Sequence, residues 1–205
     1  FNLLKIAFHE YGDIWRLTGM EHIVWLGDSE RPQYTGGRES SLQALADAAG
    51  EHPVETFLRL SDKSDGRALF TVRFFNQNLE ALRRVLSHEF VMPGLGDAGA
   101  HVSQIMDAGW STFVLSHWGR DEELYSLEEA VRRITSAPAR VLGVADRGTI
   151  TPGLRADINV IDIDRLGERM PEIVHDFPGG AKRFVQRANG YRATICNGKT
   201  LLLDD

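Results

Sequence analysis

The sequence contains a single cysteine, Cys196, among its 205 residues. One thiol cannot form an internal disulfide, and sparse cysteine is typical of reducing compartments. No apolar run approaches the roughly 20 residues that a membrane-spanning helix needs. Basic residues are outnumbered as well, since 23 lysines and arginines face 29 aspartates and glutamates, for a net charge of −6. We therefore expect a cytoplasmic protein that binds neither membranes nor, as a main partner, nucleic acid.

The sequence also does not begin with methionine. The opening residues, Phe1-Asn2-Leu3-Leu4-Lys5, contain neither an initiator methionine nor a signal peptide. The composition, with 42% hydrophobic and 25% charged residues, is ordinary for a soluble globular protein. A chain of this length can build one good core or two small ones. We expect further sequence upstream of Phe1.

Helix and strand patterns alternate in the first part of the chain. Residues 69–75 are aromatic and β-branched, which is typical of a strand. Apolar positions recur over a predicted helix at 79–86, which Asn78 can cap. The short apolar run 90–93 follows, and its pattern indicates a buried strand. Strand, helix and strand in this order predict a βαβ unit of a parallel sheet and an α/β fold.

Capping residues mark further helix starts. Ser40 opens a helix that ends at Gly50, and Pro53 begins the next one. Ser126 with Glu129 forms a predicted capping box at the start of another helix. The positions predicted to be buried on that helix are Leu127, Ala130, Val131 and Ile134.

The pattern changes to short strands near Asp146. Residues 158–161 have the character of a strand. Two further runs, 192–196 and 199–203, flank Asn197-Gly198, a strong signal for a two-residue hairpin turn. The tail is therefore predicted to be a small β module distinct from the α/β part.

Residues 94–101, Gly-Leu-Gly-Asp-Ala-Gly-Ala-His, combine glycines with two chemically active side chains. Asp97 follows the predicted strand 90–93 on a loop with little side-chain bulk, and His101 comes four positions later. In a (β/α)₈ barrel, polar residues at the carboxyl ends of strands carry the chemistry. A plain Asx-type turn among glycines is the alternative that the local pattern leaves open.

Three blocks, in their order and spacing, resemble the metal-dependent amidohydrolases, in the branch that contains the D-aminoacylases. Residues 94–101 resemble the last barrel strand of that family. Residues 126–135, with Pro138-Ala139-Arg140, resemble the helical pair that follows it. Residues 146–157 resemble the return of the chain into a small β-sandwich.

This resemblance implies the C-terminal part of a (β/α)₈ TIM barrel in residues 1–145 and part of a β-sandwich in residues 146–205. A complete barrel needs about 250 residues, so the missing N-terminal part of the barrel is an expected partner. An open sheet edge would pair with that part or with a second copy, which gives a homo-oligomer. The alternative is that residues 1–60 fold back over the gap.

The resemblance also implies the roles of individual residues. Amide hydrolysis needs a stronger nucleophile than neutral water, and a bound divalent metal supplies it by lowering the pKa of its water. Asp97 would be the catalytic general base and a metal ligand, with zinc as the cofactor. His101 would bind the substrate carboxylate, or else be a loop histidine bonded to the backbone. His117, beside Trp118, could line the pocket, but is interpreted first as a packing or surface residue.

Two features of the family are absent from this sequence. There is no His-x-His pair, and a catalytic zinc normally has three protein ligands. The other ligands are therefore expected outside this sequence. The arginine that clamps the substrate in D-aminoacylases is not evident between Gln104 and His117. The histidines left unassigned to metal are His9, His22, His52, His88 and His175.

The function implied is hydrolysis of non-peptide amide C–N bonds in a small molecule, an N-acyl amino acid or a related amide. The resemblance points first to an N-acyl-D-amino-acid deacylase. A hydantoinase-like or dihydroorotase-like cyclic amidase is the second interpretation, and a non-catalytic scaffold protein on the same fold is the third. The 205 residues alone are expected to be inactive.

Overall fold

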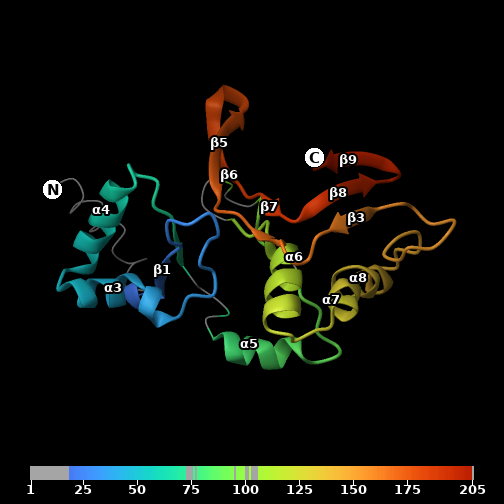
Figure 1. The fold of residues 1–205 in the computed structure, drawn as a ribbon, viewed down its shortest axis with the longest axis horizontal. Helices are drawn as coiled ribbons and strands as arrows, with labels where there is room; N and C mark the ends of the chain where they lie inside the picture. The colour runs from blue at the N-terminus through green and yellow to red at the C-terminus, as the bar shows by residue number, and fades with distance from the viewer. Residues whose placement is uncertain are drawn as a thin grey trace. The chain divides into compact units, whose positions relative to one another are not determined.

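The fold, seen in a computed structural model, is mixed α/β, as the sequence predicts (Figure 1). The structure describes residues 19–72, 76, 78–94, 96–99, 102 and 106–204. The chain divides into two compact units, Phe1–Leu82 and Arg83–Asp205. None of the helices in these described ranges is long and apolar enough to cross a membrane.

The first unit packs a two-stranded sheet with two helices. Strands β1 and β2 pair antiparallel, with Ile23 opposite Val72. The core consists of Ile23, Leu42 and Leu60, so it joins the sheet to both helices. The elements described in this unit are η1 (Met20–His22), β1 (Ile23–Trp25), η2 (Arg38–Ser40), α3 (Leu42–Ala49), α4 (Pro53–Lys63) and β2 (Phe70–Val72).

The ends of its helices follow local capping rules. The cap of α3 is Ser41 and not the expected Ser40, because Ser40 lies in η2 and the Ser41 hydroxyl accepts the Ala44 N–H. Gly50 ends α3 in the left-handed conformation, φ 65°, which confirms the predicted stop. His52 caps α4 and forms a capping box with Glu55, so this histidine has a structural role.

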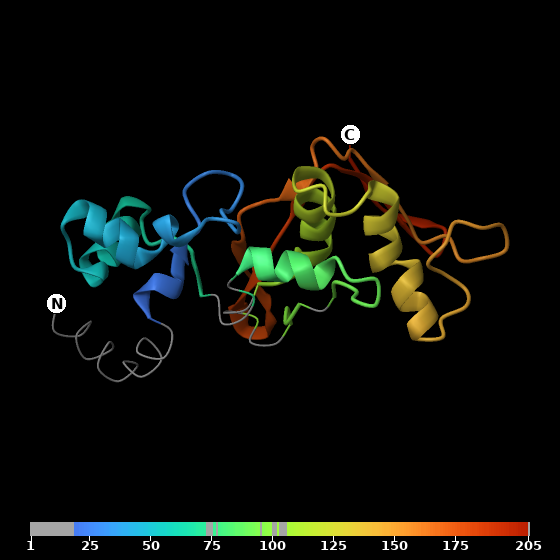
Figure 2. The same cartoon turned by 90° about the horizontal axis from the view of Figure 1, so that it is seen from below.

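The second unit begins with short helices. Asn78 caps α5, as predicted, by accepting the Ala81 N–H at 2.9 Å. Figure 2 shows α7 and α8 in gold as two consecutive short helices. The elements are α5 (Leu79–Leu86), which starts at the end of the first unit, α6 (Trp110–Phe113), the π-helix η3 (Val114–Asp121), α7 (Leu127–Ile134) and α8 (Ser136–Val141).

The buried face of α7 differs from the predicted one. Ala130 and Arg133 are the buried positions, whereas Leu127 is 47% and Val131 39% exposed. Ser126 caps the helix as predicted, but the Glu129 carboxylate binds two arginines. The helix α7 therefore turns the charged side chain of Arg133 toward the interior.

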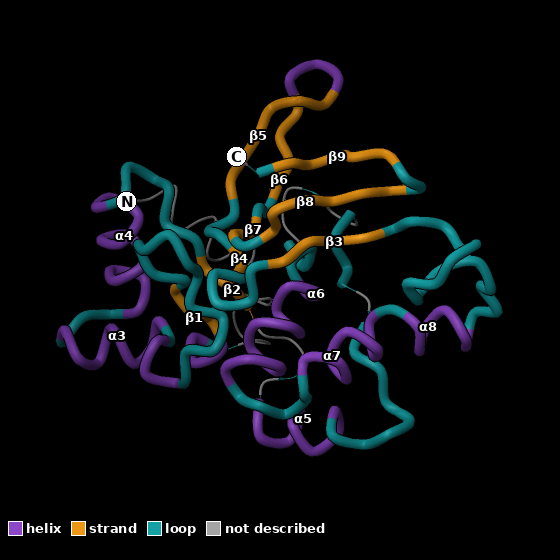
Figure 3. Tube along the Cα trace, turned by 45° about the vertical axis from the view of Figure 1, so that its right-hand side comes forward, coloured by secondary structure: helices purple, strands orange, loops and turns teal. Residues whose placement is uncertain are grey.

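The remaining strands of the second unit form three small antiparallel sheets. Figure 3 shows β3, β8 and β9 side by side, and Figure 1 shows the β5–β6 hairpin apart from β8 and β9. The predicted turn at Asn197-Gly198 is confirmed, since both residues have positive φ, 50° and 78°. The strands are β3 (Ile158–Ile161), β4 (Gly167–Glu168), β5 (Glu172–Phe177), β6 (Ala181–Val185), β7 (Ala188–Asn189), β8 (Tyr191–Cys196) and β9 (Lys199–Leu203), with η4 (Pro178–Gly180) between β5 and β6.

Arg120 links the helices of this unit to the chain that precedes β4. Its Nη1 donates to the backbone oxygens of Ile163, at 2.8 Å, and Leu166, at 2.7 Å. Its Nε donates to the Asp121 carboxylate at 2.6 Å. With a longer bond to the Asp164 carbonyl at 3.5 Å, a single guanidinium thus supplies donors to three carbonyls of a segment that lies outside the helices and strands.

The prediction of a strand at residues 90–93 is wrong. These residues form a turn and coil, and Phe90 is 83% exposed. Every strand pair in the described part of the chain is antiparallel, and β2 pairs with β1, so the predicted βαβ unit is not formed there. The Val91 carbonyl is bound by Arg133 instead of a neighbouring strand. The barrel, the sandwich and the boundary after residue 145 stay predictions.

Candidate active site

Asp97 lies on an exposed loop that is fixed on its downstream side by Asp107. The Asp97 N–H donates to the Asp107 carboxylate at 3.3 Å. Gly96 lies so close to the Asp107 backbone carbonyl that a Cβ at position 96 would collide with it. The glycine is therefore required here for close approach of two backbones. The Asp97 carboxylate is exposed, so it can meet a reactant in solution.

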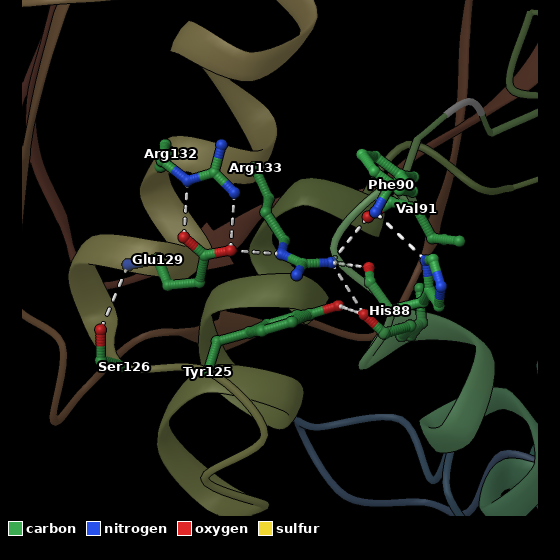
Figure 4. Close-up of polar contacts among 9 residues, drawn as sticks. His88, Phe90, Val91, Tyr125, Ser126, Glu129, Arg132 and Arg133 are labelled. Atoms are coloured by element: carbon green, nitrogen blue, oxygen red, sulfur yellow. Dashed lines mark hydrogen bonds and ion pairs between the residues drawn. The ribbon is translucent and has the colours of Figure 1, made fainter.

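Arg133 of α7 holds the segment that leads into this loop (Figure 4). Its Nη1 donates to the backbone oxygens of Leu86, His88 and Val91, at 2.8, 2.9 and 2.6 Å. The Leu86 carbonyl belongs to the last turn of α5, where carbonyls have no partner inside the helix. Arg133 is only 5% exposed, so these bonds are shielded from water. This contact explains why α7 buries a charge.

Glu129 balances that buried charge from one turn earlier on the same helix. Its carboxylate accepts from Arg133 Nε at 2.6 Å and from Arg132 at 2.6 and 2.7 Å. These bonds, those of Arg132 first, lower the pKa of Glu129 from 4.5 to about 2. The carboxylate is therefore ionised at neutral pH and holds the guanidinium in one orientation.

Tyr125 completes the cluster from the loop before α7. Its hydroxyl donates to the same Leu86 carbonyl at 2.7 Å, and its ring lies under the Arg133 guanidinium at 4.7 Å. Burial raises the pKa of this phenol, so the group stays a donor. Figure 4 shows Tyr125 and Arg133 pointing toward the stretch of chain that carries His88 and Val91.

Acid should remove the stabilisation that Glu129 contributes. The folded pKa is below the unfolded one, so this stabilisation is fully present above about pH 4.5 and is lost as the pH falls toward 2. We expect the difference in Tm between the unmodified protein and Glu129→Gln to narrow from about pH 5 to about pH 2. Thermal unfolding followed by circular dichroism measures it.

Glu123→Gln is the matched control for this measurement. Glu123 is exposed and takes part in no ion pair among the residues that the structure describes. The difference in Tm between the unmodified protein and Glu123→Gln should stay small and should not change with pH over the same range. A difference in Tm between the unmodified protein and Glu129→Gln that does not change with pH would mean that the Glu129 carboxylate has an ordinary pKa.

The predicted histidine sites have different outcomes. His101 lies outside the described residues, so its contact with a substrate stays a prediction. His117 lies in η3 with its ring 4.6 Å from those of Phe113 and Trp118, measured between ring centroids. Burial lowers its pKa, and its Nε2 has no hydrogen bond among the described residues. The ring contacts agree with a packing role for His117, and a place in the pocket lining stays a prediction.

The other described histidines have local contacts. His88 Nδ1 accepts the Phe90 N–H, and His175 Nδ1 is bonded to the Gly180 carbonyl. Over the described part of the chain, no three His, Cys, Asp or Glu side chains are grouped so that they could hold a metal ion. Asp97 alone does not fit a catalytic zinc, which takes three protein ligands. The described residues therefore do not make up a metal site.

The sequence analysis missed Arg133, although a signal for it exists. Glu129 precedes Arg132 and Arg133 by three and four positions, which is the spacing of ion pairs on one helix face. Because Ala130 and Ile134 flank this face, an arginine between them has to find acceptors in the interior. Which carbonyls it finds depends on α5, about 40 residues away, and no local pattern contains that information.

The sequence profile of the amidohydrolase family matches residues 16–202, which is most of the chain. The chain belongs to the amidohydrolase family. Two curated relatives from Alcaligenes xylosoxydans xylosoxydans are similar to this amidohydrolase. An N-acyl-D-glutamate deacylase is 37% identical over 102 residues, 47% of this chain and 20% of its own length. A D-aminoacylase is 34% identical over 127 residues, 61% of this chain and 24% of its own length.

A solved structure shares the fold of this amidohydrolase. The N-acyl-D-glutamate deacylase of Bordetella bronchiseptica, complexed with zinc and a phosphonate inhibitor, superposes with a TM-score of 0.52 at 24% identity. The match covers 91% of this chain and 36% of the deacylase. The chain thus spans about a fifth to a quarter of its curated relatives and a third of this structure.

Proposed function

We propose that the complete protein is a zinc-dependent amidohydrolase that deacylates N-acyl-D-amino acids. The observation that carries the proposal is an exposed carboxylate, Asp97, on a loop held between Asp107 and the Arg133 cluster, in a chain of the amidohydrolase family. Two relatives that are deacylases of D-configured substrates support this substrate class. Their N-acyl amino acids are small molecules, so no macromolecular substrate is required.

Asp97 is proposed to be the general base and then the general acid. Its carboxylate takes a proton from the attacking water as the water oxygen bonds to the amide carbon. The same proton then passes to the amine nitrogen as the C–N bond breaks, which yields a carboxylic acid and an amino acid. An exposed carboxylate on an anchored loop can serve both steps, because it must be reachable by water and stay in place.

Zinc and the rest of the architecture belong to the same proposal. Because the described residues do not make up a metal site, the ligands other than Asp97 are proposed to lie outside them. His101 is proposed to bind the substrate carboxylate. Residues 1–145 are proposed to belong to a (β/α)₈ barrel and residues 146–205 to a β-sandwich, both completed by chain outside these 205 residues.

Enantiomeric substrates test the proposed function. The complete protein, expressed from the whole open reading frame and loaded with zinc, is assayed with the N-acetyl-D and N-acetyl-L forms of glutamate and leucine. We expect kcat/KM for a D form to exceed that for its L form by about a hundredfold or more, since the wrong enantiomer leaves polar groups of the site unpaired. Ninhydrin detection of the released amine measures it.

Cyclic amides and a chelator serve as controls for this assay. Hydantoin and dihydroorotate should be poor substrates, and removal of the metal should abolish the deacylation. Faster turnover of a cyclic amide than of any N-acyl amino acid would favour the cyclic amidase. Absence of turnover with every substrate, in a folded and zinc-loaded protein, would favour a scaffold protein.

A further inference from the structure

We propose that Arg133 is a positioning residue that holds the catalytic loop by its backbone. The inference rests on the proposed function, because it gives Arg133 importance through Asp97. Its basis is the convergence of three main-chain oxygens on one buried guanidinium nitrogen, just before the chain reaches the loop. The block of residues 126–135 thereby acquires a role toward the block of residues 94–101.

The contact fixes the point from which the loop departs. Leu86 ends α5, and Val91 lies six residues before Asp97. With both carbonyls on Arg133 Nη1, residues 86–91 keep one course without forming a strand. Pro93 restricts the following backbone further by its fixed φ. The bond from the Asp97 N–H to Asp107 then holds the loop at the proposed base itself, so the loop is anchored both before Gly94 and at Asp97.

The geometry requires an arginine. Nη1 carries two N–H groups for three acceptors, at 2.6–2.9 Å, and Nε is at the same time occupied by Glu129. A lysine has a single nitrogen and cannot meet the carbonyls and Glu129 with the same planar arrangement. Glu129 and the Tyr125 ring set the orientation of the guanidinium. The unit that acts on the loop is therefore the complete cluster around Arg133.

Arg132 offers a matched control, because it shares one partner and lacks the others. Both arginines bind Glu129, but the Arg132 side chain is 42% exposed, against 6% for Arg133. Among the described residues, no hydrogen bond joins Arg132 to residues 86–91. Replacing either arginine disturbs the same carboxylate, and only one replacement releases the loop. The comparison separates positioning from loss of an ion pair.

The test compares Arg133→Lys with Arg132→Lys in the complete, zinc-loaded protein. We expect Arg133→Lys to lower kcat at least about tenfold with KM changed less than about threefold, because a misplacement near 1 Å can cost about a hundredfold. Arg132→Lys should keep kcat within about twofold. Amide hydrogen exchange of residues 92–99 should be faster in Arg133→Lys than in Arg132→Lys. Equal effects of the two variants would overturn the inference.

Combination with Asp97→Asn shows whether Arg133 acts through that residue. If it does, Arg133→Lys in the Asp97→Asn background lowers kcat by no more than about twofold further. A full additional tenfold loss would mean that Arg133 acts elsewhere. If Asp97→Asn itself leaves kcat unchanged, the proposed role of Asp97 fails and the positioning role of Arg133 fails with it, whereas absence of deacylation by the unmodified protein would mean that the proposed function fails. If Asp97→Asn is inactive while Arg133→Lys is normal, only the positioning role fails.

Tyr125→Phe keeps the test decisive if Arg133→Lys does not fold. This change removes one donor to the Leu86 carbonyl and leaves the ring beneath the guanidinium in place. We expect kcat to fall about threefold and exchange at residues 92–99 to increase, with an unchanged circular dichroism spectrum. A folded Tyr125→Phe protein with normal kcat and normal exchange would overturn the inference.

Discussion

Asp97→Asn in the complete, zinc-loaded protein should lower kcat at least about a hundredfold, with KM changed less than about threefold. Asparagine preserves the size of the side chain and can keep the Asp97 N–H bond to Asp107, because that bond uses the backbone. What is lost is the ability to take and return a proton. Steady-state kinetics with the preferred N-acyl amino acid measure the effect, and circular dichroism verifies the fold.

Asp47→Asn is the control for this substitution. Asp47 lies exposed on α3 in the other compact unit and accepts a hydrogen bond from Gln43, which asparagine can also accept. Its kcat should equal that of the unmodified protein. Near-normal kcat in a folded Asp97→Asn protein would reduce Asp97 to a turn residue among glycines, which is the alternative that its local sequence allows.

The isolated 205-residue chain should not persist as a monodisperse monomer. Strand β9 is an edge of its sheet, and Leu201, Leu202 and Leu203 are 69%, 47% and 70% exposed. An exposed apolar edge strand presents both unpaired backbone groups and hydrophobic side chains to other chains. We expect light scattering to give a mass well above 22.9 kDa, from self-association.

A charged edge provides the matched variant for this experiment. Leu201 and Leu203 are the two most exposed leucines of β9. Lysine at both positions, Leu201→Lys with Leu203→Lys, should shift the chain toward monomer, because charges on an edge strand oppose pairing. Lysine at the exposed Val85 on α5 should have no such effect. A cooperative, monodisperse monomer of the unmodified chain would contradict the expectation that the exposed edge of β9 pairs with another chain.

The elements that the sequence predicted correctly depend on neighbours in the chain. The stop of α3 at Gly50, the Asn78 cap of α5 and the hairpin at Asn197-Gly198 each follow from the conformation or hydrogen bonding of one or two residues. Such signals lie within four positions of the structure they specify. These elements can therefore be predicted from the sequence before any tertiary contact is known.

The incorrect predictions concern residues whose structure depends on contacts with residues far away in the sequence. Residues 90–93 have the apolar character of a strand, but their conformation follows from Arg133, about 40 residues away. The predicted buried positions Leu127 and Val131 are exposed because the helix turns toward those same carbonyls. Asp97 was singled out through its family resemblance, since glycines around an aspartate also describe an ordinary turn. His101 stays a prediction, because it lies outside the described residues.

Holding a segment by its main-chain oxygens has a consequence for how the protein can vary. Every amino acid carries the carbonyl that Arg133 binds, so these three hydrogen bonds do not depend on which side chains stand at positions 86, 88 and 91. Phe90, whose side chain is 83% exposed, illustrates a position free to change. The opposite holds at position 133, where the whole requirement is concentrated in one side chain. Arg120 repeats the arrangement before β4. Two arginines thus fix the backbone of two segments that lie largely outside helices and strands. We therefore expect fewer substitutions to be tolerated at the arginines than in the segments they bind.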